Sequence, residues 1–165
     1  MRGVADSSFL ISLSIVDALW LLPHFFETTI IPPAVYQEVV VEGEGKPGAK
    51  EVKEAKWITV LTPSPEGVAF FRSQGLGLGE AEALALVAEG EGDVILTDDE
   101  RAWQVAQKHN LSFLRSLELL LEAHRRNLLT KEEVIEKVQQ LRQKRWLSPK
   151  VTEIAIQQIK KTNSF

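Results

Sequence analysis

The 165-residue chain contains no cysteine. This absence excludes disulfide bonds, thiol nucleophiles and zinc sites built on thiolates, and it is compatible with the reducing cytoplasm, where we expect the protein to act.

Long hydrophobic runs are also missing. The apolar N-terminal stretch is interrupted by Asp6 and Asp17, and each uncharged part on either side of Asp17 is about half of the roughly 20 residues that a membrane-spanning helix needs. No small-residue cleavage site follows, so we expect neither an export signal nor a membrane partner.

Charge is distributed unevenly along the chain. The net charge is −4, but residues 1–100 hold 6 Lys and Arg against 17 Asp and Glu, whereas residues 101–165 hold 13 against 6. A solvated helical surface is the usual explanation of a charge run. The alternative is that the basic end faces a polyanion that the acidic end processes, because carboxylates that are not neutralised repel phosphate.

Patterns typical of strands and helices alternate through residue 114, and only helical patterns follow. Strands are expected at residues 2–6, 28–31, 57–61, 94–97 and 111–114. Helices are expected at residues 7–14, after Pro33, and at 79–89, 99–110, 116–127, 130–146 and 148–161, with a loop at 42–50. This alternation predicts a three-layer α/β/α fold with a central parallel sheet and extra C-terminal helices. We divide the chain into an α/β domain, residues 1–126, and a helical extension, residues 127–165, packed on the same domain.

Carboxylates follow two of the predicted strands. Asp6 ends the first strand, and Asp98 and Asp99 follow the fourth. In open α/β sheets, ligands bind outside the carboxyl ends of the strands, near the point where the strand order reverses. These acids therefore converge if the two strands are neighbours. Two further acids, Glu38 and Glu80, lie on predicted helices that can aim them inward.

Some of these acids also have a structural explanation. An acid in a first helical turn, such as Glu80, is commonly only a favourable partner of the helix dipole, and Asp99 alone would be a helix cap. The combination is more informative, because four or five carboxylates in one cleft raise one another's pKa unless a cation neutralises them. Ligation by oxygen alone suits Mg²⁺ or Mn²⁺ rather than zinc. The sequence therefore predicts a divalent-metal site.

Four segments together resemble the PIN-domain family, and especially its branch found beside small antitoxin genes in bacteria and archaea. They are ADSSFLISL, IPPAVYQEVV, GLGEAEALALVAE and VILTDDERAWQVAQKHNL, in the family's order and spacing within residues 5–111. The resemblance implies a Mg²⁺- or Mn²⁺-dependent ribonuclease that hydrolyses single-stranded RNA and needs no side-chain nucleophile. It adds an antitoxin protein as a candidate partner and a homodimer as the expected assembly.

The same resemblance assigns roles to individual residues. Asp6, Glu38 and Glu80 correspond to the family's first three metal-binding acids. The fourth is either Asp99, which the family's Thr-x-Asp pattern selects, or Asp98, which is nearer the strand. Supporting roles are expected for three hydroxyl residues: Ser8, Thr97 and Ser116.

The chain departs from the family after the fourth segment. The family usually has a Gly-Thr pair where this chain has Arg115 and Ser116, which removes a flexible backbone and places a cation near the acids. We expect Arg115 to be a candidate RNA contact. Three basic or aromatic residues nearer the C-terminus are further candidates: Lys144, Arg145 and Trp146.

Alternatives to a nuclease remain on the sequence alone. A catalytically impaired PIN-fold module that binds RNA or a protein partner is the first. A phosphoacceptor domain of the receiver type is more distant, because it needs an acidic pair at the first strand, where Ser7 and Ser8 follow Asp6.

The last helix also carries an apolar stripe that either the chain's own core or a second subunit must cover. The members of the stripe are Val151, Ile154, Ala155 and Ile159.

Overall fold

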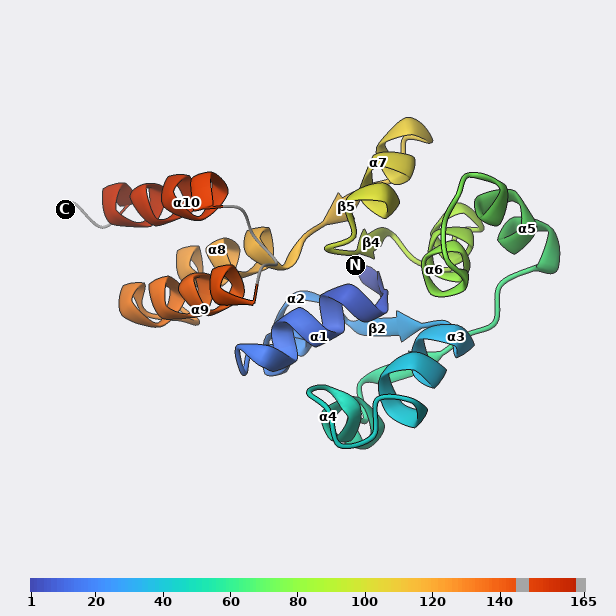
Figure 1. Ribbon diagram of the computed structural model, residues 1–165, viewed down its shortest axis with the longest axis horizontal. Helices are drawn as coiled ribbons and strands as arrows, with labels where there is room; N and C mark the ends of the chain where they lie inside the picture. Colours follow the sequence, from blue (N-terminus) through green and yellow to red (C-terminus); the bar gives the residue numbers. More distant parts are fainter. Residues whose placement is uncertain (145–148, 163–165) are drawn as a thin grey trace. The chain divides into compact units, whose positions relative to one another are not determined.

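The structure is a computed structural model, and it describes residues 1–144 and 149–162. The chain divides into two compact units, Met1–Arg115 and Ser116–Phe165. The first unit contains a five-stranded sheet with flanking helices, and the described part of the second unit is formed by three helices (Figure 1).

The sheet is parallel throughout. Its strands are β1 (Arg2–Ala5), β2 (Thr28–Ile31), β3 (Ile58–Val60), β4 (Val94–Leu96) and β5 (Phe113–Leu114), arranged in the order β3-β2-β1-β4-β5. The strand order reverses at β1, because the chain passes from β1 to β2 on one side and later returns to β4 on the other. The predicted strands and the predicted three-layer α/β/α fold are confirmed.

The helical elements of the first unit connect these strands. They are α1 (Ser7–Ile15), the 3₁₀ turn η1 (Leu19–Leu21), α2 (Leu22–Phe25), α3 (Pro33–Tyr36), the π-helical turn η2 (Gln37–Val41), α4 (Ala49–Glu54), α5 (Pro65–Ser73), α6 (Leu78–Ala88) and α7 (Glu100–Lys108). Helix α6 packs on β1 and β4, and α5 and α7 pack against α6. The predicted loop is confirmed as far as Gly48, after which α4 begins.

Both faces of the sheet are buried at its central strands, β1 and β4. On one face, Val4 of β1 and Ile95 of β4 belong to a hydrophobic cluster with α6. On the opposite face, Gly3 leaves room for two large side chains: a Cβ on Gly3 would lie 2.8 Å from Leu96 and 3.2 Å from the ring of Phe26. Burial on both faces explains why the strands read as short continuous apolar runs rather than as alternating patterns.

Helix α5 was not predicted from the sequence, although the chain carries its start signals. Ser64 is the N-cap, and its hydroxyl accepts the backbone N–H of Gly67 at 3.0 Å. Pro65 occupies the first helical position, where the missing N–H costs nothing. A serine followed by a proline and then an acid was therefore a readable helix start.

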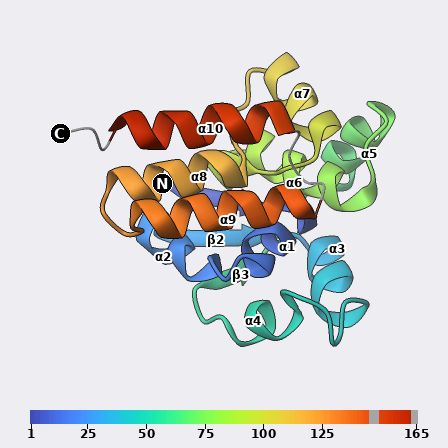
Figure 2. The ribbon, with the colours of Figure 1, turned by 60° about the vertical axis from the view of Figure 1, so that its left-hand side comes forward.

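Helices α8 (Ser116–Arg125), α9 (Lys131–Gln143) and α10 (Pro149–Thr162) form the described part of the second unit. Helix α9 packs against both of the others (Figure 2). Helix α9 begins with a capping box, in which the side chains of Thr130 and Glu133 each accept the other residue's backbone N–H. Our division of the chain at residue 126 and the packing of the extension on the α/β domain stay predictions.

The apolar stripe of α10 is partly covered within the chain. Ala155 and Ile159 are buried, whereas Ile154 is 48% exposed. The side chain of Val151 lies outside the described part.

Among the residues that the structure describes, no single helix is long and apolar enough to cross a membrane, and one bent pair, Ser7–Ile15 with Leu19–Phe25, qualifies by length and composition only.

Candidate functional site

The carboxyl ends of β1 and β4 place Asp6 beside residues 97–99. The two strands pair with Ala5 opposite Leu96, and the backbone N–H of Asp6 donates to the carbonyl of Leu96 at 3.1 Å. The first and fourth strands are therefore neighbours at the reversal of strand order, where ligands bind in sheets of this kind. Asp6 itself is almost completely buried.

Three donors hold the carboxylate of Asp6. The hydroxyl of Ser8 donates to Oδ1 at 2.6 Å, the backbone N–H of Phe9 donates to the same oxygen at 3.1 Å, and the hydroxyl of Thr97 donates to Oδ2. The bond from Phe9 makes Asp6 the N-cap of α1. All three bonds favour the ionised form of the carboxyl group and fix its orientation.

The same two hydroxyls also hold the turn that follows β4. Ser8 Oγ accepts the backbone N–H of Asp98 at 2.9 Å, and Thr97 Oγ1 accepts the backbone N–H of Asp99 at 3.1 Å. Asp99 Oδ1 in turn accepts the N–H of Ala102 at 2.8 Å, so Asp99 is the N-cap of α7. The two hydroxyls thus join this turn to the buried carboxylate at the end of β1.

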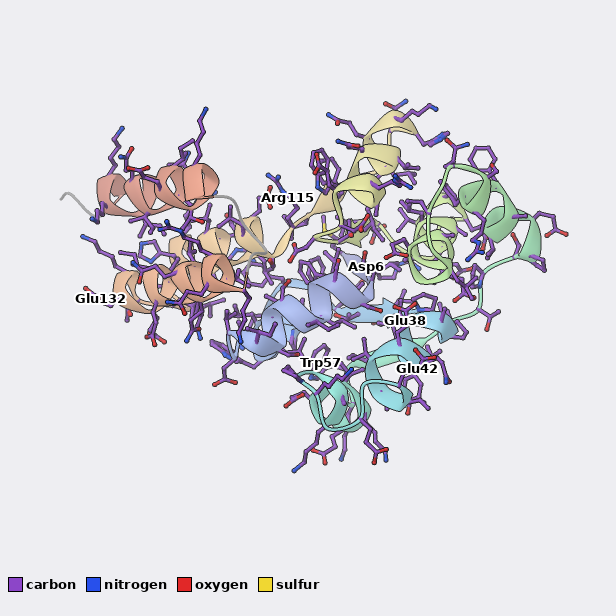
Figure 3. All side chains as sticks on the ribbon, viewed as in Figure 1. Asp6, Glu38, Glu42, Trp57, Arg115 and Glu132 are labelled. Atoms are coloured by element: carbon purple, nitrogen blue, oxygen red, sulfur yellow. The ribbon has the colours of Figure 1, made fainter. Side chains whose placement is uncertain are left out.

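Glu38 reaches the site from the π-helical turn η2. In this turn, the backbone N–H of Glu42 donates to the carbonyl of Gln37 at 2.8 Å, and single π-helical turns occur frequently at functional sites. The hydroxyl of Ser7 donates to Glu38 Oε2 at 2.6 Å. Because Ser7 directly follows Asp6 in the chain, this bond brings Glu38 to the first turn of α1, near Asp6 (Figure 3).

Two glycines before and within α6 leave room for carboxylates. A Cβ on Gly79 would lie 2.8 Å from Oε1 of Glu38, and a Cβ on Gly77 would lie 2.7 Å from Oε2 of Glu80. The first approach joins α6 to η2, and the second lies at the N-terminus of α6. The absence of a side chain at Gly79 therefore allows the Glu38 carboxylate to lie against the helix that carries Glu80.

The carboxylates also act on one another electrostatically. Burial is the largest cause that raises the pKa of Glu80; its own backbone N–H lowers this pKa, and the charges of Asp99 and Glu38 raise it again. Burial likewise raises the pKa of Asp6 to about 7, against the effect of its three hydrogen bonds, and the charge of Glu80 adds to the increase. We call these four residues the acidic cluster: Asp6, Glu38, Glu80 and Asp99.

The acidic cluster has the donor chemistry of a Mg²⁺ or Mn²⁺ site. All of its donors are carboxylate oxygens, and a bound cation would offset both the burial and the mutual repulsion of the charges. Within residues 1–144 and 149–162, however, no three or more His, Cys, Asp or Glu side chains are grouped so that they could hold an ion. The residues thus fit a divalent metal by chemistry and charge. In this structure the carboxylates of Asp6 and Glu38 instead accept hydrogen bonds from separate hydroxyl groups.

The remaining predicted site residues have other surroundings. The guanidinium carbon of Arg115 lies 5.5 Å from the centroid of the Trp103 ring. Ser116 is buried at the start of α8, and Lys144 is exposed directly after α9, both in the second unit. Two predicted RNA contacts lie outside the described residues: Arg145 and Trp146. The expected roles of all these residues stay predictions.

The structure adds two polar residues that the sequence analysis assigned no role in the site. Ser7 bonds to Glu38, and a serine directly after a strand-end aspartate was a signal that could have been read. Glu82 Oε2 accepts the backbone N–H of Ala34 at 2.9 Å, which anchors the start of α3 and so the chain that leads into η2. Nothing in the sequence indicates this second contact, because it joins residues 48 positions apart.

Comparison with known proteins agrees with this geometry. A family model described as a PIN domain matches residues 2–161, which is nearly the whole chain. A search of the curated proteins found no match. PIN domains are generally nucleases and typically use divalent metals, as the carboxylate chemistry of the acidic cluster would require. The chain therefore belongs to the PIN-domain family and has its nuclease-like fold.

Proposed function

We propose that the protein is a metal-dependent endoribonuclease that hydrolyses phosphodiester bonds of single-stranded RNA. The observation that carries the proposal is that the buried carboxyl group of Asp6 lies beside the turn that carries Asp99, while Glu38 lies against the helix that carries Glu80. Perturbed carboxyl groups at the carboxyl edge of a parallel sheet are typical of a functional site. Membership of a family of nucleases supports hydrolysis of a phosphodiester as the reaction.

In this proposal, Asp6, Glu38 and Glu80 hold Mg²⁺ or Mn²⁺ together with Asp99 or Asp98. The bound ion supplies a water molecule of lowered pKa and stabilises negative charge on the phosphate. Asp99 is the better supported fourth acid, because its charge acts on Glu80. Its carboxylate also caps α7, so one side chain would serve both the helix and the site.

The hydroxyl residues prepare these acids for their role. Ser8 and Thr97 donate to Asp6, and Ser7 donates to Glu38. Hydrogen bonds to a carboxylate restrict its rotation. The acids are therefore oriented before any substrate binds, which reduces the reorganisation that catalysis requires.

We further propose that the protein is the toxin of a toxin–antitoxin pair and forms a homodimer. The support is the likeness of its four motifs to the branch encoded beside antitoxin genes, together with the exposed Ile154 on α10. A neighbouring gene for a short, antitoxin-sized protein would support the first part. Light scattering at micromolar concentration tests the second, and a strictly monomeric species would contradict it.

A catalytically impaired module that binds RNA is the second candidate. Two observations favour it. Arg115 and Ser116 stand in place of the family's usual Gly-Thr pair, and the acids of the described part are not grouped as metal ligands.

A cleavage assay distinguishes the two candidates. The full-length protein is incubated with labelled single-stranded RNA in Mg²⁺, Mn²⁺ or EDTA, alongside Asp6→Asn and, as a matched loss of charge, Glu132→Gln. Glu132 is an exposed acid on α9 of the second unit (Figure 3). We expect cleavage by the wild type and by Glu132→Gln with metal, and none in EDTA or by Asp6→Asn. Binding without cleavage would favour the impaired module, and unreduced cleavage by Asp6→Asn would contradict the site.

A further inference from the structure

An arginine stacked on an aromatic pair follows the last strand of the first unit. The rings of Trp103 on α7 and Phe113 on β5 are stacked, with centroids 5.6 Å apart and planes inclined by 19°. The guanidinium carbon of Arg115 lies 5.5 Å from the centroid of Trp103, and all three side chains are partly buried. Because Phe113 and Arg115 are two positions apart in extended chain, they project to the same side, and Trp103 contacts both.

Strand pairing determines where this arginine lies. Leu114 pairs with Leu96, and the backbone N–H of Thr97 donates to the carbonyl of Leu114 at 3.1 Å. Arg115 therefore leaves the sheet at the same edge as Thr97, whose hydroxyl donates to Asp6. The ends of β5 and β1 are separated by two inter-strand spacings, or roughly 10 Å. The stacked arginine therefore lies at the same edge of the sheet as the acidic cluster, with the end of β4 between it and Asp6 (Figure 3).

An acidic cluster alone repels RNA, whose backbone carries a negative charge at each phosphate. A positive charge beside the cluster offsets this repulsion and attracts the strand. Arginine suits the task because its planar guanidinium presents N–H donors in a fixed fork that matches two phosphate oxygens. Contact with the Trp103 ring restricts the orientation of this fork, so less conformational freedom is lost when phosphate binds.

We propose that Arg115, held on Trp103, binds an RNA phosphate beside the acidic cluster and thereby positions the substrate strand. The inference rests on the proposed function, because it takes RNA as the ligand, but it concerns binding rather than hydrolysis. Arg115 is then a substrate-binding residue, and Trp103 is a positioning residue that acts through it. The replacement of the family's glycine adds a substrate contact at this position.

The salt dependence of RNA binding tests the proposal. Full-length protein carrying Asp6→Asn, which we expect to prevent cleavage, is titrated into fluorescein-labelled single-stranded RNA in Mg²⁺, and fluorescence anisotropy is measured at several salt concentrations. Four changes are compared in this background: Arg115→Ala, Arg115→Lys, Trp103→Leu and Lys108→Ala. Lys108 is the matched control, because it is an exposed cation at the C-terminal end of α7. The acidic cluster adjoins the N-terminal end of this helix, and Glu100 at that end lies about 12 Å from Lys108 along the helix axis.

We expect Arg115→Ala to weaken binding roughly tenfold and to reduce the slope of log affinity against log salt by about 0.7. Arg115→Lys should restore the slope and only part of the affinity, because lysine keeps the charge but lacks the fork. Trp103→Leu should weaken binding and keep the slope, since the charge remains. Lys108→Ala should resemble the parent.

Three results would overturn the proposal: an unchanged slope for Arg115→Ala, an equal loss for Lys108→Ala, or no measurable RNA binding by the parent. Circular dichroism shows whether each variant keeps the helical content of the parent. Cleavage by the wild type is measured separately, so a protein that binds RNA through Arg115 without cutting it would contradict the proposed function and support this inference.

Discussion

Replacement of Asp6 by asparagine should change how the stability of the metal-free protein depends on pH. Burial raises the pKa of this carboxyl group from 3.8 to about 7 in the folded protein. Between these two values the folded protein binds one proton more than the unfolded chain, so the contribution of Asp6 to the free energy of unfolding falls as the pH rises. Below pH 3.8 Asp6 contributes no penalty, and above pH 7 the full penalty is present.

The size of this effect follows from the same interval. At about 1.36 kcal/mol per pH unit, the interval from 3.8 to about 7 corresponds to a penalty on the order of 4 kcal/mol in the absence of a cation. Asparagine removes the charge and keeps an oxygen that can accept from Ser8 and Phe9, as Asp6 Oδ1 does. We therefore expect Asp6→Asn to be more stable than the wild type at pH 8 in EDTA, with an advantage that disappears near pH 4.

Urea denaturation in EDTA across this pH range measures the effect. The difference between Asp6→Asn and the wild type is the informative quantity, because other titrating groups contribute similarly to both. Mn²⁺ at pH 8 should then stabilise the wild type more than Asp6→Asn, since an ion that binds only the folded state raises the free energy of unfolding. Parallel pH profiles for the two proteins in EDTA would refute the reasoning, because the buried carboxyl group would then carry no penalty.

Three further changes test the surroundings of the acidic cluster. Gly79→Ala should slow RNA cleavage because the added Cβ would displace Glu38, and cleavage at the wild-type rate would contradict this reasoning. The same change should keep or raise the free energy of unfolding, since alanine favours a helix by up to about 1 kcal/mol relative to glycine. Thr97→Val should lower the free energy of unfolding by about 1 to 3 kcal/mol and slow cleavage, because Asp6 Oδ2 loses its donor. Thr97→Ser keeps the hydroxyl, so its free energy of unfolding and its cleavage rate should match those of the wild type. Glu80→Gln should lower the pKa of Asp6, because the charge of Glu80 is one cause of its increase; an NMR titration of the metal-free protein measures this pKa, and an unchanged value would show that the two groups do not interact.

The position of Asp6 beside residues 97–99 could be predicted from the sequence, because both segments follow a recognisable local pattern. Asp6 and residues 98–99 come directly after apolar strands, and neighbouring parallel strands bring such residues to one edge of the sheet. The structural roles that we had set against function also proved real, since Asp99 caps α7 and is part of the acidic cluster. A helix cap and a proposed metal ligand can therefore be the same residue.

The contacts that shape the site were not readable in the same way. The bond from Ser7 to Glu38 joins residues 31 positions apart, and the close approach of Glu38 to Gly79 depends on how η2 meets α6. The apolar spacing around Glu38 predicted an ordinary helix, because a single π-helical turn leaves no clear mark on the periodicity. Likewise, the sequence predicted Arg115 only as a cation near the acids, and its contact with Trp103 is known from the structure alone.

The central claim is that the acidic cluster holds a divalent cation. Isothermal titration of the metal-free protein with Mn²⁺ at pH 8 tests it most directly, with Asp6→Asn and Glu80→Gln as site variants and Glu132→Gln as the control for lost charge. The account predicts saturable binding by the wild type and by Glu132→Gln, and binding that is strongly weakened in both site variants. Mn²⁺ binding of equal strength in all four proteins, or none in the wild type, would contradict it.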